Sequence, residues 1–124
     1  MIRCLGIRGA TTADANTSAA ILDATEELMK QLVAANGLVE DDVAAVFFTM
    51  TTDLTADFPA TAARIRLGWE QTAFMTAHEV PVPGSTPSVI RVLALVNTNK
   101  TKEELVHSYL RGASNLRSWG KAQA

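Results

Sequence analysis

The stretch Ser88–Val96, which reads SVIRVLALV, is the most β-prone apolar run of the chain and decides the fold. In the two-residue alternation of a strand, the even-numbered positions from 90 onward form one apolar face, and Arg91 shares the other face with aliphatic side chains. A strand that is apolar on both faces is typical of a sheet that is covered on both faces. We therefore expect this strand to have protein packed on each side.

Arg91 is the residue of this strand that needs an explanation. Its guanidinium stays charged and carries five N–H donors in a fixed fork, and desolvating it costs several kcal/mol unless an anion meets it. Either a carboxylate of the protein pairs with Arg91, or the strand presents a permanent positive charge to a ligand. Glu79 in the apolar stretch Thr72–Val82, and Arg8 after the stretch Ile2–Ile7, favour one polar site built on a sheet.

The composition is that of one globular domain over residues 1–124, with 48% hydrophobic and 19% charged residues. The net charge of −2 gives no support for nucleic acid or an anionic membrane surface as a partner. No apolar run approaches the ~20 residues of a membrane span, and the N-terminus reads as a strand and not as a signal peptide. We expect a cytoplasmic protein with a mobile tail over residues 113–124.

The order of elements predicts an α+β fold, a mixed sheet with flanking helices. The expected strands are Ile2–Ile7 (ended by Gly9), Val43–Thr49, Thr72–Val80 and Ser88–Val96. The expected helices run from Thr17 to Ala35, from a cap at Asp57 to Leu67, and from the capping box at Thr101 to about Arg111.

Few residues offer nucleophilic or metal chemistry. Cys4, the only cysteine, excludes an intramolecular disulfide and is expected to pack in the core. His78 and His107 show no ligand spacing with it, so we expect neither a metal nor a cofactor. The trio of Ser85, His78 and Asp53 has no local support as a catalytic triad. What remains is an arginine-rich site that suits binding a small polyanion, or a reaction that needs positioning and charge stabilisation.

An ordered set of short motifs over Ile2 to Arg117 resembles one family, the monofunctional chorismate mutases of the Bacillus type. The matching pieces are GIRGATT from Gly6, TDL from Thr52, FPA from Phe58, Arg64, GW from Gly68, Glu79, PGS from Pro83, IRV from Ile90, YL from Tyr109, and LR from Leu116. The resemblance implies a homotrimer with a trimeric pseudo α/β-barrel and active sites between subunits. It implies the rearrangement of chorismate to prephenate, at the branch point to phenylalanine and tyrosine, without a cofactor or metal.

The resemblance also implies roles for individual residues. Arg91 would meet the charge that grows on the ether oxygen, Arg8 would bind a carboxylate near it, and Glu79 would accept a hydrogen bond from the ring hydroxyl. Tyr109 would contact a carboxylate from the C-terminal helix. The other implied substrate-binding residues are Phe58, Ala60, Arg64, Met75, Thr76, Leu116 and Arg117.

Three positions depart from the family pattern, and two other functions stay open. Thr61 stands where some members carry lysine, Thr76 where others have cysteine, and Ser118-Trp119 where Pro-Asp is common. A trimeric Rid-type imine deaminase would also use an arginine for a carboxylate, but it would not explain Glu79 together with Tyr109. A non-catalytic trimeric module that binds an aromatic-pathway anion is the second alternative.

Overall fold

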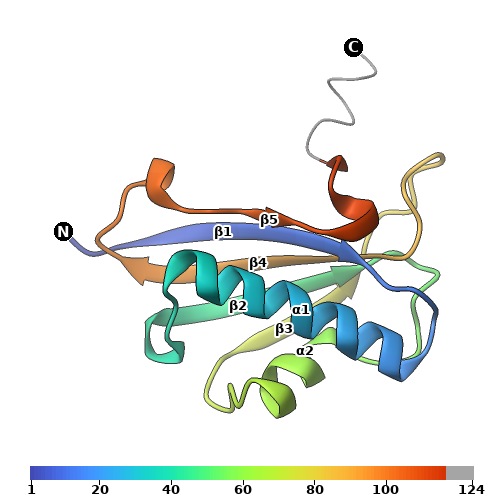
Figure 1. Ribbon diagram of the computed structural model, residues 1–124, viewed down its shortest axis with the longest axis horizontal. Helices are drawn as coiled ribbons and strands as arrows, with labels where there is room; N and C mark the ends of the chain where they lie inside the picture. The colour runs from blue at the N-terminus through green and yellow to red at the C-terminus, as the bar shows by residue number, and fades with distance from the viewer. Residues whose placement is uncertain (117–124) are drawn as a thin grey trace.

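The chain forms a five-stranded mixed sheet with two helices, and the computed structural model describes residues 1–116 (Figure 1). The strands are β1 (Arg3–Thr12), β2 (Val43–Met50), β3 (Phe74–His78), β4 (Val89–Thr98) and β5 (Ser108–Tyr109). The helices are α1 (Ser18–Asn36) and the short α2 (Pro59–Thr61), which continues as a wider π-helical turn over Ala62–Arg66. The α+β class predicted from the sequence is confirmed.

The sheet has the strand order β3-β2-β4-β1-β5, so β4 lies at its centre. Strand β4 pairs antiparallel with β1 and with β2, while the outer strands β3 and β5 pair parallel to their neighbours. The stretch that contains Arg91 is therefore the central strand of the sheet.

Both helices lie on one face of the sheet, which we call the helix face (Figure 1). The even-numbered side chains of β4 from Ile90 to Val96 point to this face and are buried with the apolar stripe of α1, which includes Ile21, Leu28 and Leu32. The opposite side of the sheet, the outer face, carries the odd-numbered side chains of β4. Within one chain the outer face is only partly covered, because Leu93 is 38% exposed and Met75 is 63% exposed.

Helix α1 begins and ends within one residue of the bounds that the sequence predicts, Thr17 and Ala35. The Thr17 hydroxyl accepts a hydrogen bond from the backbone N–H of Ala20 at 3.1 Å and caps the first turn. Gly37 adopts a left-handed conformation with φ 62° and terminates the helix.

Strand β1 continues through Gly9 to Thr12, so the expectation that Gly9 ends it is wrong. Gly9 lies opposite Val92, and a β-carbon there would come within 3.0 Å of the Ser108 carbonyl oxygen. A glycine is needed at this position because the neighbouring strand approaches closely, and not because the chain turns there. Cys4 on the same strand is exposed on the outer face, which corrects the prediction that it packs in the core.

The helix predicted after Thr101 does not form. The capping box is present, but it closes only a 3₁₀ turn, Lys102–Glu104, and the chain then extends into β5. Tertiary hydrogen bonds override the local signal: Asn36 binds the backbone of Val106, and the N–H of Leu110 donates to the carbonyl of Ala10 at 2.9 Å. Tyr109 therefore lies on an edge strand and not on a helix.

Asp57 does not cap α2 as expected, because Phe58 occupies the cap position without a side-chain bond. The carboxylate of Asp57 instead accepts bonds from the Ser18 hydroxyl at 2.6 Å and from the N–H of Phe58 at 2.7 Å. Asp57 thus joins the loop before α2 to the start of α1.

Candidate active site

Arg91 and Glu79 form an ion pair on the outer face of the sheet. The Nε of Arg91 lies 2.9 Å from Oε2 of Glu79, which follows directly after β3. Thr49 lies on β2 directly opposite Arg91, and its hydroxyl donates to the same Oε2 at 2.7 Å. The backbone N–H of Glu79 donates to the carbonyl of Met50 at 2.8 Å, which holds the glutamate against β2. Three strands thus fix one carboxylate and one guanidinium.

A cavity of about 330 Å³ lies beside this pair on the outer face. Its lining comes from β1, β2, β4 and β5: Arg8, Gly9, Phe47, Thr49, Arg91, Val92, Leu93 and Tyr109. Tyr109 reaches the cavity because β5 places it beside Ala10 of β1. Four residues that the sequence analysis associates with one site therefore gather here: Arg8, Arg91, Tyr109 and, through the ion pair, Glu79.

The charges of this group suit an anionic ligand. Two guanidinium groups face one carboxylate, so the site keeps a net positive charge although the whole chain is negative. The ion pair occupies Nε of Arg91, whose side chain remains 46% exposed, so its terminal N–H groups can still donate to a ligand. Arg91 and Thr49 both bind Oε2 of Glu79, and within residues 1–116 no side chain binds Oε1, which can accept a ligand hydroxyl.

Comparison with known proteins decides the family. The model for chorismate mutase type I matches residues 4–119. The chain belongs to the type I chorismate mutase family. A curated relative from Thermus thermophilus, named chorismate mutase AroH, is 50% identical over 113 residues, which cover 90% of this chain and 92% of that protein. A second, the chorismate mutase AroH of Bacillus subtilis (strain 168), is 36% identical over 117 residues, or 94% of this chain and 91% of that protein.

A solved structure agrees with this assignment. A chorismate mutase from Clostridium thermocellum superposes with a TM-score of 0.86 at 49% sequence identity, covering 88% of this chain and 96% of that chain. The enzyme is thus an isomerase of chorismate in aromatic amino acid biosynthesis, which decides against the imine deaminase and the non-catalytic module. No helix within residues 1–116 is long and apolar enough to cross a membrane. In that same range no cluster of three His, Cys, Asp or Glu is arranged to hold a metal ion.

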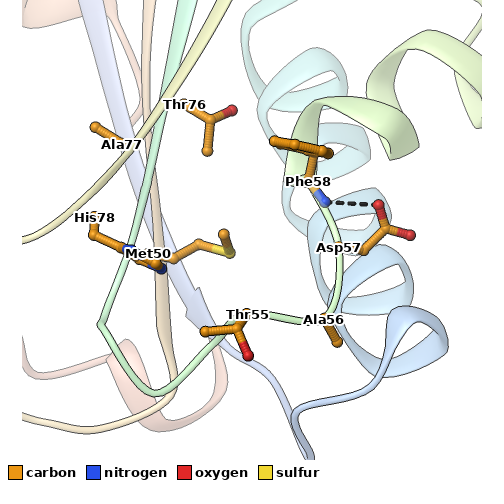
Figure 2. A pocket seen from close by; sticks show the side chains of 8 residues that line it. All are labelled: Met50, Thr55, Ala56, Asp57, Phe58, Thr76, Ala77 and His78. Carbon is orange, nitrogen blue, oxygen red and sulfur yellow. Dashed lines mark hydrogen bonds between the residues drawn. The ribbon is translucent and has the colours of Figure 1, made fainter.

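A second group of candidate residues of this mutase lies elsewhere, beside α2. Phe58 and Thr76 line a cavity of about 390 Å³ that opens between the end of β3 and the loop before α2 (Figure 2). Thr76 is paired with Phe48 of the core, so it points to the helix face, opposite to Arg91. Phe58 is 66% exposed, although its side chain is large and apolar. One chain therefore does not bring this group together with the Arg91 group.

The remaining candidates are spread over the molecule. Ala60 is buried in the core of its own chain, and Arg64 is exposed on the π-helical turn after α2. Met75 is exposed on the outer face, near the edge that β3 forms. Leu116 is half-buried and, like Tyr109, packs against the small cluster of Ala10, Val89 and Ala113. Arg117 lies outside the described residues.

The structure adds residues that the sequence analysis did not single out for the site. Thr49 and Phe47 line the cavity, and His107 bonds the backbone of Arg8. Alternation along Val43–Thr49 could have placed Thr49 and Phe47 on one face of their strand. No pattern in the sequence could have paired Thr49 with Arg91, because the register between the two strands was unknown.

Asp53 organises the loop that precedes β4. Its carboxylate accepts a hydrogen bond from the Thr51 hydroxyl and bonds from the backbone N–H and hydroxyl of Ser88, which has φ 58°. The bond from Thr51, followed by those from Ser88, holds the pKa of Asp53 below its ordinary value. Asp53 thereby anchors the residue from which β4 leads to Arg91.

Proposed function

We propose that the cavity on the outer face is the chorismate site and that Arg91, Arg8 and Glu79 carry the rearrangement. The observation that carries this assignment is the Arg91–Glu79 ion pair, at 2.9 Å, beside a cavity that also contains Arg8 and Tyr109. Chorismate is a dicarboxylate, and guanidinium forks are the appropriate receptors for its carboxylates.

The chemistry needs charge stabilisation more than proton transfer. The ether C–O bond breaks ahead of C–C bond formation, so negative charge grows on the ether oxygen. A terminal N–H of Arg91 donates to this oxygen, and the positive charge of the guanidinium is already in place before the reaction begins. Oε1 of Glu79 accepts the hydrogen bond of the ring hydroxyl, while its Oε2 holds Arg91. Arg8 and Tyr109 bind a carboxylate and keep the substrate in its compact reactive conformer.

The site is completed by a second copy of the chain in a homotrimer. The outer face leaves Leu93 and Met75 exposed, and the second group of candidate residues lies on the opposite side of the sheet. A head-to-tail contact between copies covers the apolar outer face and brings Phe58 and Arg64 of one copy to Arg91 of the next. This arrangement would supply the second cover that the apolar central strand requires.

A direct assay tests the assignment. The purified enzyme should convert chorismate to prephenate with no added metal or cofactor, and light scattering at micromolar concentration should report about three times 13.3 kDa. A fully active monomer would rule out the shared site. The cytoplasmic location stays a prediction, which cell fractionation tests.

A further inference from the structure

The segment before β5 is fixed by the amide side chain of Asn36, the last residue of α1. Its Oδ1 accepts from the N–H of Val106 at 2.8 Å, and its Nδ2 donates to the carbonyl of Val106 at 2.9 Å. Nδ2 also donates to the carbonyl of Leu32 at 3.0 Å, so Asn36 is itself held by the helix. The backbone of Val106 is thereby occupied, and the next residue, His107, is set beside β1.

His107 takes the place of a backbone acceptor along β1. The carbonyl of Ala10 accepts from Leu110 of the β5 segment at 2.9 Å. Alternate residues of a strand direct their backbone groups to the same edge, so the N–H of Arg8 also points toward this segment. Its acceptor there is Nδ1 of His107, at 2.9 Å, and not a carbonyl oxygen.

This bond requires one protonation state of the ring. Nδ1 can accept an N–H only with a free lone pair, so the imidazole must be neutral and carry its proton on Nε2. Arg8 from β1, together with Lys102 and Glu103 from the 3₁₀ turn, lines the same hollow as His107. Gly6 of β1, Leu93 of β4 and Leu105 line it as well, and none of these three is charged. Arg8 and Lys102 oppose a positive charge on the ring and Glu103 favours one, so it is the bond from the N–H of Arg8 that requires the neutral ring.

We propose that neutral His107 is a positioning residue of the rearrangement, acting through Arg8. By holding the N–H of Arg8 it fixes the backbone from which this arginine reaches the substrate cavity. Protonation of Nδ1 removes the acceptor, so the backbone of Arg8 is released and turnover falls in acid. The inference rests on the role of Arg8 proposed above.

The test compares two variants across pH. Asparagine offers Oδ1 at nearly the position of Nδ1 but does not titrate, whereas leucine offers no acceptor. We expect wild-type kcat/KM to fall below about pH 6.5, the region in which imidazoles commonly titrate. His107→Asn should keep kcat/KM within about threefold at pH 8 and lose this acid limb. His107→Leu should lose about tenfold or more at pH 8, because small displacements of a binding group are costly to turnover.

Several outcomes overturn the inference. These are an unchanged acid limb in His107→Asn, a loss in His107→Asn as large as that in His107→Leu, or full activity of His107→Leu at pH 8. Thermal melts and light scattering on each variant show whether a loss of activity comes from a loss of folding or assembly. If His107→Leu does not fold, the pH profile of His107→Asn alone decides the question. A wild-type enzyme that makes no prephenate, or an Arg8→Ala variant with unchanged kinetics, would instead refute the proposed function.

Discussion

Oε2 of Glu79 receives two donors from neighbouring strands, the Nε of Arg91 at 2.9 Å and the hydroxyl of Thr49 at 2.7 Å. Because Thr49 and Arg91 are direct partners in the register of β2 and β4, the sheet itself fixes the direction of the guanidinium. The carboxylate therefore orients Arg91 through one oxygen and keeps its other oxygen for the substrate.

Glu79→Gln should keep the fold and lower kcat about 10- to 100-fold, since a poorly oriented group loses much of its positional advantage. Thr49→Val should lower kcat by no more than about 100-fold, because one hydrogen bond to a charged group contributes about 1.5–3 kcal/mol at most and ~1.4 kcal/mol corresponds to a factor of ten in rate. The two losses should be less than additive in the double variant, as both act through Oε2. Steady-state kinetics on the four proteins measures this coupling, with Glu70→Gln as an exposed control. Fully additive losses would show that Thr49 does not act through Glu79.

Complementation between subunits tests whether the site is shared. Arg91→Ala and Phe58→Asp should each be nearly inactive, the second because its carboxylate repels the substrate dianion. Co-expression of the two chains should restore activity, because about a quarter of all sites in a random mixture of the two chains combine an intact Arg91 with an intact Phe58 of the neighbour. Activity no higher than the sum of the two separate variants would place all site residues on one chain.

The pH dependence of kcat should be flat from about pH 7 to 9, because no step moves a proton and arginine stays charged. Solvent deuterium should leave the chemical step nearly unchanged. His78 bonds the carbonyl of Leu54 through Nε2 at 2.9 Å, so His78→Gln should leave this plateau unchanged. The measurement is kcat against pH for both proteins in H₂O and D₂O. A bell-shaped profile with a large solvent isotope effect would contradict a rearrangement driven by fixed charge.

Stability should depend on pH through Asp53. Its folded-state pKa lies below the ordinary value of 3.8, so the carboxylate stabilises the fold above that pH and loses this contribution as the pH falls through the folded-state pKa. Asp53→Asn should therefore lower the Tm at pH 7, and the difference from wild type should narrow in acid. Thermal melts at pH 7, 4 and 2.5 provide the comparison. A difference that is constant across these pH values would show that the charge of Asp53 does not stabilise the loop.

The central strand could be predicted from sequence because its signal is local. Alternation and β-branched side chains around Arg91 identify the strand without reference to any partner. The ends of α1 were equally predictable, because Thr17 and Gly37 carry the cap signals themselves. The cost of burying an unpaired charge indicated that Arg91 needs an anionic partner, but the sequence left open whether a carboxylate of the protein or a ligand supplies it.

The errors arose where distant contacts override local signals. The capping box at Thr101 is real, but Asn36 binds the backbone of Val106 from 70 positions away and draws the chain into β5. Gly9 resembles a strand terminator in sequence, yet it serves the close approach of Ser108. Cys4 lies on the outer face, and the alternation of β1 alone could not show which face the helices cover.

Replacement of Arg91 tests most directly whether its fixed positive charge drives the reaction. Arg91→Ala should preserve the fold and lower kcat by at least ~10²–10³-fold, the usual cost of removing one preorganised donor. Arg91→Lys should restore only part of the rate because lysine lacks the fork, and Arg3→Ala, at the far end of β1, should match wild type. The decisive quantity is kcat for prephenate formation by Arg91→Ala under saturating chorismate, with the fold checked by circular dichroism. A loss of two orders of magnitude or more is the predicted result, and a kcat within about tenfold of wild type would contradict the account.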